Sequence, residues 1–290
     1  MEQKTVKTGL VLEGGAMRGM FTCGVLDVFM ENGITFDGAA GISAGAVFGC
    51  NFKSHQIGRA VRYNKQYGRD PRYCSIRSLV RTGDLYGAKF CYDDLPNRLD
   101  PFDQETFRKD PMEFYIGATD MNTGHAVFHL CKDMGRKDLQ WMRASASMPL
   151  VSRIVRVDGF ELLDGGIVTS VPYGFMERRE YNRNVIVLTQ PAGYCKEPVK
   201  MALFKVMLRK YPKVVEAMAV RHEMYNRQME EISQREASGE SLVIRPPESL
   251  GIKRTENDPD QLERVYQIGR REAERRLPDV RTFLGGCAKA

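Results

Sequence analysis

The sequence of 290 residues has no apolar run approaching the roughly 20 residues that a membrane-spanning helix needs, and its polar start, MEQKTVKTG, lacks the apolar segment of a signal peptide. We therefore expect a cytoplasmic protein. Its seven cysteines are scattered, odd in number and never arranged as CxxC, so they indicate neither a disulfide framework nor a zinc site. The nucleotide-binding patterns GxGxxG and GxxxxGKS/T are also absent, and the sequence predicts no metal and no other cofactor.

The chain does contain two successive patterns of strand, loop and helix. Residues 8–13 form a short apolar run stopped by glycines, and residues 20–31 carry apolar side chains at helical spacing. Residues 36–40 and 44–52 repeat the pattern, which is typical of an α/β protein with a mostly parallel sheet. Helices are expected after residue 196, and further strands over residues 113–119, 126–130, 160–163, 184–189 and 241–245.

The pentapeptide GISAG lies where the second strand meets the second helix. It fits the GxSxG nucleophile elbow, in which Ser43 projects from a strained turn and the flanking Gly41 and Gly45 relieve crowding. An incidental serine in a tight turn is the alternative, because so short a pattern also occurs by chance. The strand before it and the helix after it supply the context that an elbow requires, so we interpret Ser43 as a nucleophile.

A second glycine-rich segment, GGAMRG at residues 14–19, joins the first strand to its helix. Its backbone N–H groups can converge near the positive end of that helix, an arrangement that stabilises an oxyanion. A phosphate-binding loop is the competing interpretation, but it leaves the neighbouring GxSxG unexplained. We therefore favour an oxyanion hole.

A nucleophilic serine needs a base, and histidine is the usual one. Of the four histidines, only His222 follows the hydrolase order of serine, acid and histidine, and it lies in a charged helical stretch without a loop signal. Asp164 is the better partner, because the apolar run FELL delivers its carboxylate to a strand end and Gly165 and Gly166 let other backbone approach. An ordinary Asp-Gly turn is the alternative.

The segments GLVLEGGAMRG, GISAG, RASASMPL and LLDGG occur in the order and spacing found in patatin-like phospholipases, and the chain resembles this family over residues 8–190. The resemblance implies a three-layer α/β/α fold with a mostly parallel central sheet and extra C-terminal helices. It also implies a Ser-Asp dyad without histidine, with Ser43 as nucleophile and Asp164 as base.

The same resemblance assigns the oxyanion hole to the amides of Gly14, Gly15 and Ala16, with Arg18 at the family's basic position in the loop. Ala16 is a departure, because the family usually has a third glycine there. If that position requires a positive φ angle, alanine strains the loop or reshapes the hole.

The implied activity is hydrolysis of a lipid ester, of the phospholipase A or lysophospholipase type, through an acyl-enzyme. A free aspartate has a pKa of about 4 and is a weak base at neutral pH, so we expect burial or hydrogen bonding to tune the dyad. Two alternatives stay open. One is a catalytically weak lipid-binding or regulatory protein, raised by Ala16, and the other is a His-dependent esterase or thioesterase that uses His222.

Composition changes nowhere abruptly along the chain, so we expect one domain. Residues 1–195 would form a patatin-like catalytic core. Within it, residues 59–103 are a candidate lid or insertion, being rich in Arg, Tyr and Gly with weak periodicity. Residues 196–290 would be a mainly helical C-terminal extension packed on the same domain.

Basic residues gather in two segments. Residues 53–81 hold eight basic residues and one acid, and residues 196–213 hold six and one, with apolar side chains at helical spacing. The second segment predicts an amphipathic cationic helix, and together they suggest peripheral contact with an anionic membrane at the inner membrane surface. A solvated helix face paired with acids, or an apolar stripe packed on the sheet, is the alternative. We expect no nucleic-acid binding, since one Trp and no binding module accompany these charges.

Overall fold

The structure is a computed structural model that describes residues 6–285, so both chain ends, with Cys287, lie outside the described part. The chain opens with two strand and helix units. Strand β1 (Thr8–Leu12) leads through the short 3-10 helix η1 (Ala16–Gly19) into α1 (Met20–Glu31). Strand β2 (Gly38–Ile42) leads into α2 (Ala44–Lys53). Both units occur in the order that the sequence predicts, with β2 beginning two residues later than expected.

The central sheet has eight strands in the order β5-β6-β3-β2-β1-β7-β8, with β4 paired to β3. Strands β1, β2, β3, β7 and β8 pair in parallel, and β4, β5 and β6 pair antiparallel. The C-terminal ends of the parallel strands meet at one edge, where α/β proteins bind their ligands. The remaining strands are β3 (Glu113–Asp120), β4 (Ala126–Cys131), β5 (Val155–Val157), β6 (Phe160–Asp164), β7 (Arg183–Val187) and β8 (Ser241–Ile244).

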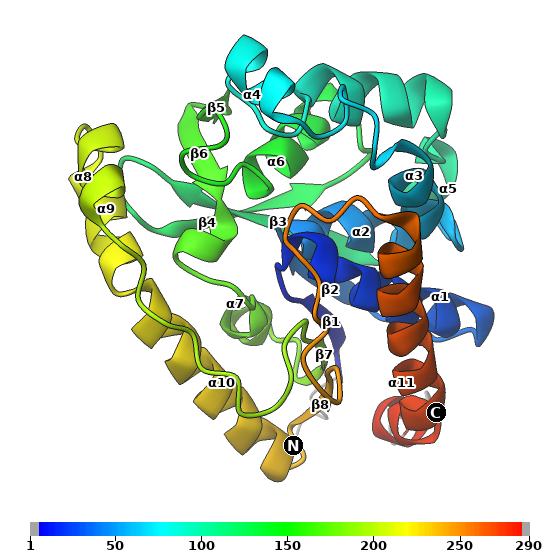
Figure 1. Cartoon of the computed structure of the whole chain (residues 1–290). Helices are drawn as coiled ribbons and strands as arrows, with labels where there is room; N and C mark the ends of the chain where they lie inside the picture. The colour runs from blue at the N-terminus through cyan, green and yellow to red at the C-terminus, as the bar shows by residue number, and fades with distance from the viewer. Residues whose placement is uncertain (1–5, 286–290) are drawn as a thin grey trace.

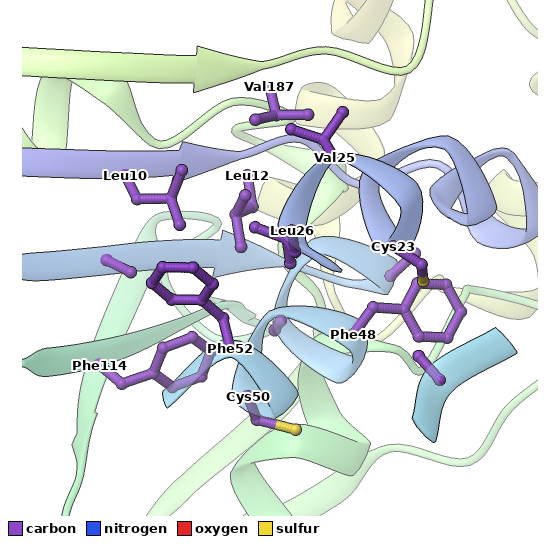
Figure 2. Packing of buried hydrophobic residues seen from close by; sticks show 14 of the residues in the cluster. Leu10, Leu12, Cys23, Val25, Leu26, Phe48, Cys50, Phe52, Phe114 and Val187 are labelled. Atoms are coloured by element: carbon purple, nitrogen blue, oxygen red, sulfur yellow. The ribbon is translucent and has the colours of Figure 1, made fainter. Parts of the chain in front are cut away.

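Helices cover both faces of this sheet, giving the three layers predicted (Figure 1). Adjacent residues of a strand point to opposite faces of the sheet. Leu10 and Leu12 of β1 therefore pack under α1 and α2. On the other face, Val11 packs with Met176 of α7 (Tyr173–Arg178) and Ile232 of α10 (Arg221–Ala237). Figure 2 shows the first of these clusters, with side chains of α1 and α2 lying over β1.

The last helix, α11 (Pro259–Gly285), lies along α1 on the same side of the sheet (Figure 1). The Tyr266 hydroxyl donates to Asp27 at 2.8 Å, and Arg270 pairs with Glu31 at 2.7 Å. Strand β8 also belongs to the later part of the chain and extends the sheet beside β7. The segment after residue 196 therefore contributes to the sheet and to both helical layers, since α10 packs on the opposite face of the sheet from α11.

Residues 59–103 are largely helical, with α3 (Arg59–Tyr67), α4 (Ile76–Thr82) and the π-helix η2 (Phe90–Leu99). Much of their positive charge is paired. Arg59 and Arg62 both contact Asp100, and Lys65 pairs with Glu263 of α11. The neighbouring α5 (Gln104–Lys109) follows before β3.

The single amphipathic helix predicted over residues 196–213 is wrong. The segment contains α8 (Ala202–Met207) and then begins a separate helix, α9 (Pro212–Ala219). Proline at residue 212 has no N–H to continue an earlier helix, which explains the break. The predicted apolar stripe turns inward, since Leu208 is buried in a cluster with Leu163 and Phe204 packs against it.

Strand β5 was not predicted, because three residues ending in a tight turn carry too little periodicity to detect. The connection before it contains α6 (Arg136–Ser145). None of the helices described within residues 6–285 combines the length and the apolar character needed to cross a bilayer.

Candidate active site

Ser43 stands between β2 and α2, where the chain turns sharply. Its backbone angles, φ 52° and ψ −121°, fall outside the regions that non-glycine residues normally occupy, a kind of strain that clusters at functional sites. A Cβ on Gly41 would come within 2.6 Å of the Gly45 backbone. A Cβ on Gly45 would come within 2.5 Å of the Leu12 carbonyl oxygen. Only glycine fits these two positions, which is the crowding expected of an elbow.

Ser145 holds the backbone of Ser43, and it was not predicted as a site residue from the sequence. Its hydroxyl oxygen accepts the Ser43 N–H at 2.8 Å and donates to the Gly117 carbonyl oxygen at 2.6 Å. Ser145 is fully buried at the end of α6, so this bridge fixes the turn to strand β3. The available signal was the segment RASASMPL, which carries part of the family resemblance.

Asp164 ends strand β6 and lines the same cavity as Ser43. Its Oδ1 accepts the Gly166 N–H at 2.7 Å. Burial raises the pKa of Asp164, while the nearby Ser43 hydroxyl, the Gly166 N–H and the charges of Arg221 and Lys196 oppose the rise. A carboxylate with raised proton affinity is a stronger base than a free aspartate.

The two glycines after Asp164 are required by close contacts. A Cβ on Gly165 would come within 2.7 Å of the Gly117 carbonyl oxygen, and one on Gly166 within 2.9 Å of Asp164 Oδ1. The DGG segment therefore lets the acidic strand end lie directly against β3.

The loop after β1 brings Gly14, Gly15 and Ala16 to the cavity that holds Ser43. The Gly14 amide, which the family resemblance assigns to the oxyanion hole, donates to the Ser170 carbonyl oxygen at 3.2 Å. No such acceptor faces the amides of Gly15 and Ala16 within residues 6–285, so these two N–H groups, unlike that of Gly14, are available to a ligand in the cavity. Ala16 has φ 50°, which is the strained left-handed conformation that the missing glycine would tolerate.

Glu13 holds the start of this loop through hydrogen bonds to two other parts of the chain. Its carboxylate is almost fully buried, with Oε2 accepting the Thr189 N–H and Oε1 accepting the Tyr225 hydroxyl at 2.9 Å. Thr189 follows β7 and Tyr225 belongs to α10, so the loop is tied to both. This role of Glu13 could not be predicted from the sequence, because its two partners lie far away along the chain.

None of the four histidines lines a cavity containing Ser43 in the described part of the chain. His222, which has the expected order in the sequence, lies on α10 with Nε2 3.8 Å from Glu223, and its Nδ1 is buried without a hydrogen-bond partner. His55 and His129 pair with aspartates other than Asp164. The geometry therefore brings Asp164, and no histidine, to the serine.

One group of side chains within residues 6–285 has the spacing to hold a metal ion, namely His129, Cys131 and Asp138, whose ligand atoms lie within 4.8 Å of one another. Asp138 already accepts His129 Nε2 at 2.6 Å and the N–H groups of residues 132–134. Burial raises the pKa of the Cys131 thiol well above its ordinary value, whereas a metal requires the thiolate. The group is better explained as a hydrogen-bonded turn.

Ser43 lies between two cavities of opposite character. The first, of about 260 Å³, is apolar and aromatic. The second, of about 120 Å³, contains Asp164 and the glycine-rich loop. A larger groove of about 500 Å³ lies between α7 and α10. Neither Ser43 nor Asp164 lines this groove, so we place the candidate site in the two cavities at Ser43. The apolar lining includes Val47, Tyr63, Tyr73, Leu85, Tyr86, Tyr92 and Leu95.

Four cationic side chains line the smaller cavity: Arg18, Lys196, Arg221 and Arg254. Only Arg18 was predicted as a site residue. The other three come from segments beyond the family resemblance, and nothing in the spacing of those residues indicates that they meet.

The comparisons with known proteins fit this arrangement. A family model described as Patatin-like phospholipase matches residues 10–176, more than half of the chain, so the chain belongs to the patatin-like phospholipase family. A second model, described as a domain of unknown function, matches residues 211–285. Family membership supports lipid hydrolysis in general.

Curated relatives are distant and longer. The uncharacterised protein YjjU of Escherichia coli is 29% identical over 64% of this chain and 53% of its own length. Lysophospholipase nte1 of Aspergillus niger is 26% identical over 58% of this chain and 11% of its own length. The uncharacterised NTE family protein Rv2565 of Mycobacterium tuberculosis is 28% identical over 58% of this chain and 28% of its own length. The chain thus spans about half or less of the length of these relatives.

Among solved structures, VipD from Legionella pneumophila matches 94% of this chain and 67% of its own, with 12% identity and a TM-score of 0.45.

Proposed function

We propose that the protein is a serine acyl hydrolase acting on lipid esters, of the phospholipase A or lysophospholipase type. Asp164 accepts the Ser43 proton as the hydroxyl oxygen attacks the ester carbonyl, and the amides of Gly15 and Ala16 hold the oxyanion. The leaving alcohol takes the proton from Asp164. Water then attacks the acyl-enzyme, with Asp164 again as base, and releases the fatty acid.

The observation that carries this proposal is the meeting of Ser43 and Asp164. A serine in a strained elbow conformation shares a cavity with a buried carboxylate whose pKa is raised by burial and lowered by the nearby serine hydroxyl. The amides of Gly15 and Ala16 line the same cavity and have no acceptor within residues 6–285. The name of the Aspergillus niger relative, a lysophospholipase, agrees with a lipid ester as substrate.

The test combines labelling by a fluorophosphonate probe with hydrolysis of p-nitrophenyl butyrate by the full chain. We expect S43A to abolish both, and D164N to lower kcat by about 1,000-fold, the scale of losing a general base. H222A should retain turnover, since His222 lines neither cavity at Ser43. Loss of turnover in H222A with D164N active would favour a His-dependent esterase. Absence of labelling and turnover in the wild type would favour a lipid-binding protein.

The proposal also predicts how kcat/KM depends on pH. Asp164 acts as a base only when ionised, and its pKa is raised by burial. We therefore expect kcat/KM to fall about tenfold per pH unit below that raised pKa. A rate that stays flat through the acidic range would contradict the assignment of Asp164 as base.

We propose further that α8 and α4 contact an anionic lipid bilayer. On α8, Leu203, Val206 and Met207 are 56%, 68% and 61% exposed, whereas Phe204 of the same helix lines the catalytic cavity. On α4, Ile76 and Val80 are 75% and 81% exposed. Exposed apolar side chains flanked by cations are suited to the boundary between lipid head groups and acyl chains. The flanking cations are Arg77, Arg81, Lys200, Lys205, Arg209 and Lys210.

A further inference from the structure

Four cations converge on the catalytic cavity from four separate segments. Arg18 comes from the loop after β1, Lys196 from the segment before α8, Arg221 from the start of α10, and Arg254 from the loop before α11. Their charges act on one another, since Arg221, Arg18 and Arg254 all lower the pKa of Lys196. So close a group of like charges opposes folding unless something compensates it.

The compensation does not come from salt bridges. Within residues 6–285 none of the four cations forms an ion pair, whereas other partly buried arginines of this chain, such as Arg143 and Arg235, do so. Arg18 Nε is buried without any hydrogen-bond partner. A buried donor left unpaired costs free energy that a bound acceptor would recover.

Two of the four cations, Lys196 and Arg221, are held in place through α10. The Lys196 N–H donates to Asn226 Oδ1 at 2.8 Å, and Asn226 Nδ2 donates back to the Lys196 carbonyl oxygen at 3.1 Å. The Lys196 ammonium lies 3.7 Å from the centre of the Tyr225 ring. Arg221, at the start of α10, donates to the Gly166 carbonyl oxygen, beside Asp164. These two charges are therefore positioned by the fold, whereas Arg254 lines the cavity from an exposed position.

The nearby acids do not balance this charge. Among the acids that act on Lys196 and Arg221 are Glu13 and Asp164. The oxygens of Glu13 accept hydrogen bonds from Thr189 and Tyr225, and Asp164 Oδ1 accepts the Gly166 N–H. When Lys196 is protonated, the four cations and two acids leave an excess of two positive charges, which is close in magnitude to the charge of a phosphate monoester at neutral pH.

We propose that Arg18, Lys196, Arg221 and Arg254 form a subsite for the phosphate monoester of a single-chain acyl ester, so that the enzyme's substrate is a lipid of the lysophosphatidate type. This rests on the proposed acyl hydrolase function. The phosphate occupies the cationic cavity, the scissile ester lies at Ser43, and the acyl chain enters the apolar cavity of about 260 Å³. A zwitterionic or uncharged head group leaves the four cations uncompensated.

The test compares three substrates that share one acyl chain and are kept below their critical micelle concentrations: lysophosphatidate, lysophosphatidylcholine and monoacylglycerol. We expect kcat/KM of the wild type to favour lysophosphatidate over monoacylglycerol by about 100-fold, the scale of charge-assisted hydrogen bonds to phosphate. K196Q and R254Q should each lower this ratio about tenfold. K253Q removes the same charge from an exposed lysine next to Arg254 that lines neither cavity, and should leave the ratio unchanged. A wild-type ratio near one, or equal losses on both substrates, overturns the proposal.

Binding to the S43A variant separates this subsite from the catalytic proposal, because it needs no turnover. By equilibrium dialysis we expect S43A to bind lysophosphatidate at least about tenfold more tightly than monoacylglycerol, and K196Q in the same background to lose that preference. Inorganic phosphate and glycerol 3-phosphate serve as chain-free probes and should bind at least about tenfold more weakly than lysophosphatidate. Equal affinity for phosphate and lysophosphatidate would mean a free-phosphate site and would overturn the lipid assignment.

Discussion

The two cavities at Ser43 differ in chemistry and in the part of the chain that builds them. The apolar cavity is lined almost wholly by residues 16–152, which lie inside the stretch matched by the patatin-like family model. The cationic cavity draws Lys196, Arg221 and Arg254 from beyond that stretch. The shared family core thus contains the proposed nucleophile and base and the apolar surface, and the later segment supplies three of the four cations.

This difference suggests a division of specificity. An apolar cavity recognises chain length through the number of methylenes that leave water, without strong directional demands. A cationic cavity recognises the charge and geometry of a head group. We therefore expect changes in the family core to alter acyl preference, and changes after residue 195 to alter head-group preference.

The largest expected effect comes from obstructing the apolar cavity at Val47. Val47 lies one helical turn after Ser43, and its N–H donates to the Ser43 carbonyl oxygen at 2.9 Å. Each methylene buried contributes about 0.8 kcal/mol, or about fourfold in kcat/KM, until the cavity is full. V47F should therefore reduce the ratio of kcat/KM for dodecanoyl over acetyl p-nitrophenyl esters by about 100-fold. V47A serves as the control and should preserve the ratio; an unchanged ratio in V47F would place the acyl chain elsewhere.

The next effect concerns α8, whose Phe204 lines the cationic cavity while other apolar side chains of the same helix are exposed. Replacing Leu203 and Met207 of α8 by serine removes apolar surface that would enter the bilayer, and should weaken binding to anionic vesicles by about 100-fold. Co-sedimentation with vesicles containing phosphatidylserine measures this directly. I57S provides the matched control, because Ile57 is 46% exposed but lies away from α8 and α4 in the sequence. Equal loss in both variants, or none in either, would remove α8 from the interface.

The layout around Ser43 was predictable because its signals are local. A short apolar run stopped by glycines, followed by helical spacing, identifies each strand and helix without reference to the rest of the chain. Even there, β2 occurs two residues later than predicted, over Gly38–Ile42. Its small residues give almost no periodic contrast, so the neighbouring strands decide its bounds.

The cationic cavity could not be predicted for the opposite reason. Lys196, Arg221 and Arg254 are brought together by the fold, and each alone resembles an ordinary surface cation. The hydrogen bond from the Gly14 amide to Ser170 is equally non-local, and it leaves Gly15 and Ala16 as the amides that we propose for the oxyanion hole. Sequence patterns identify residue types at a site, whereas the partners of each group depend on distant segments.

A smaller effect is expected on the stability of the fold. Removing a charge from the cationic cavity should raise stability, whereas enlarging the apolar cavity should lower it. The pKa of Lys196 is lowered to about 7 by burial and by Arg221, Arg18 and Arg254, with Glu13 opposing them, against about 10.4 in the unfolded chain. The protonated lysine therefore destabilises the folded state fully below pH 7, and this penalty fades as pH rises toward 10.

We expect K196Q to gain about 1 kcal/mol at pH 6, after allowing for solvent screening, and to raise Tm by about 2 °C, with a smaller gain at pH 9. V47A, which enlarges the apolar cavity, should instead lower Tm. Differential scanning calorimetry in phosphate-free buffer measures both. A K196Q protein that melts below the wild type at pH 6 would show that the cations are compensated without a ligand.

The smallest effect lies where the two cavities meet, at Ala16, which lines both. With φ 50°, alanine is strained by about 1–2 kcal/mol, and glycine would relieve this while adding about 0.5–1 kcal/mol of unfolded-chain entropy. A16G should therefore stabilise the fold by roughly 0.5 kcal/mol, measured by urea unfolding, and change kcat by less than about threefold, because the amide that serves the oxyanion hole is retained. G45A is the contrast, since its Cβ would lie within 2.5 Å of the Leu12 carbonyl oxygen, and it should lose both activity and stability. A large gain in kcat for A16G would mean instead that alanine distorts the oxyanion hole, and that this chain retains Ala16 at the expense of catalytic rate.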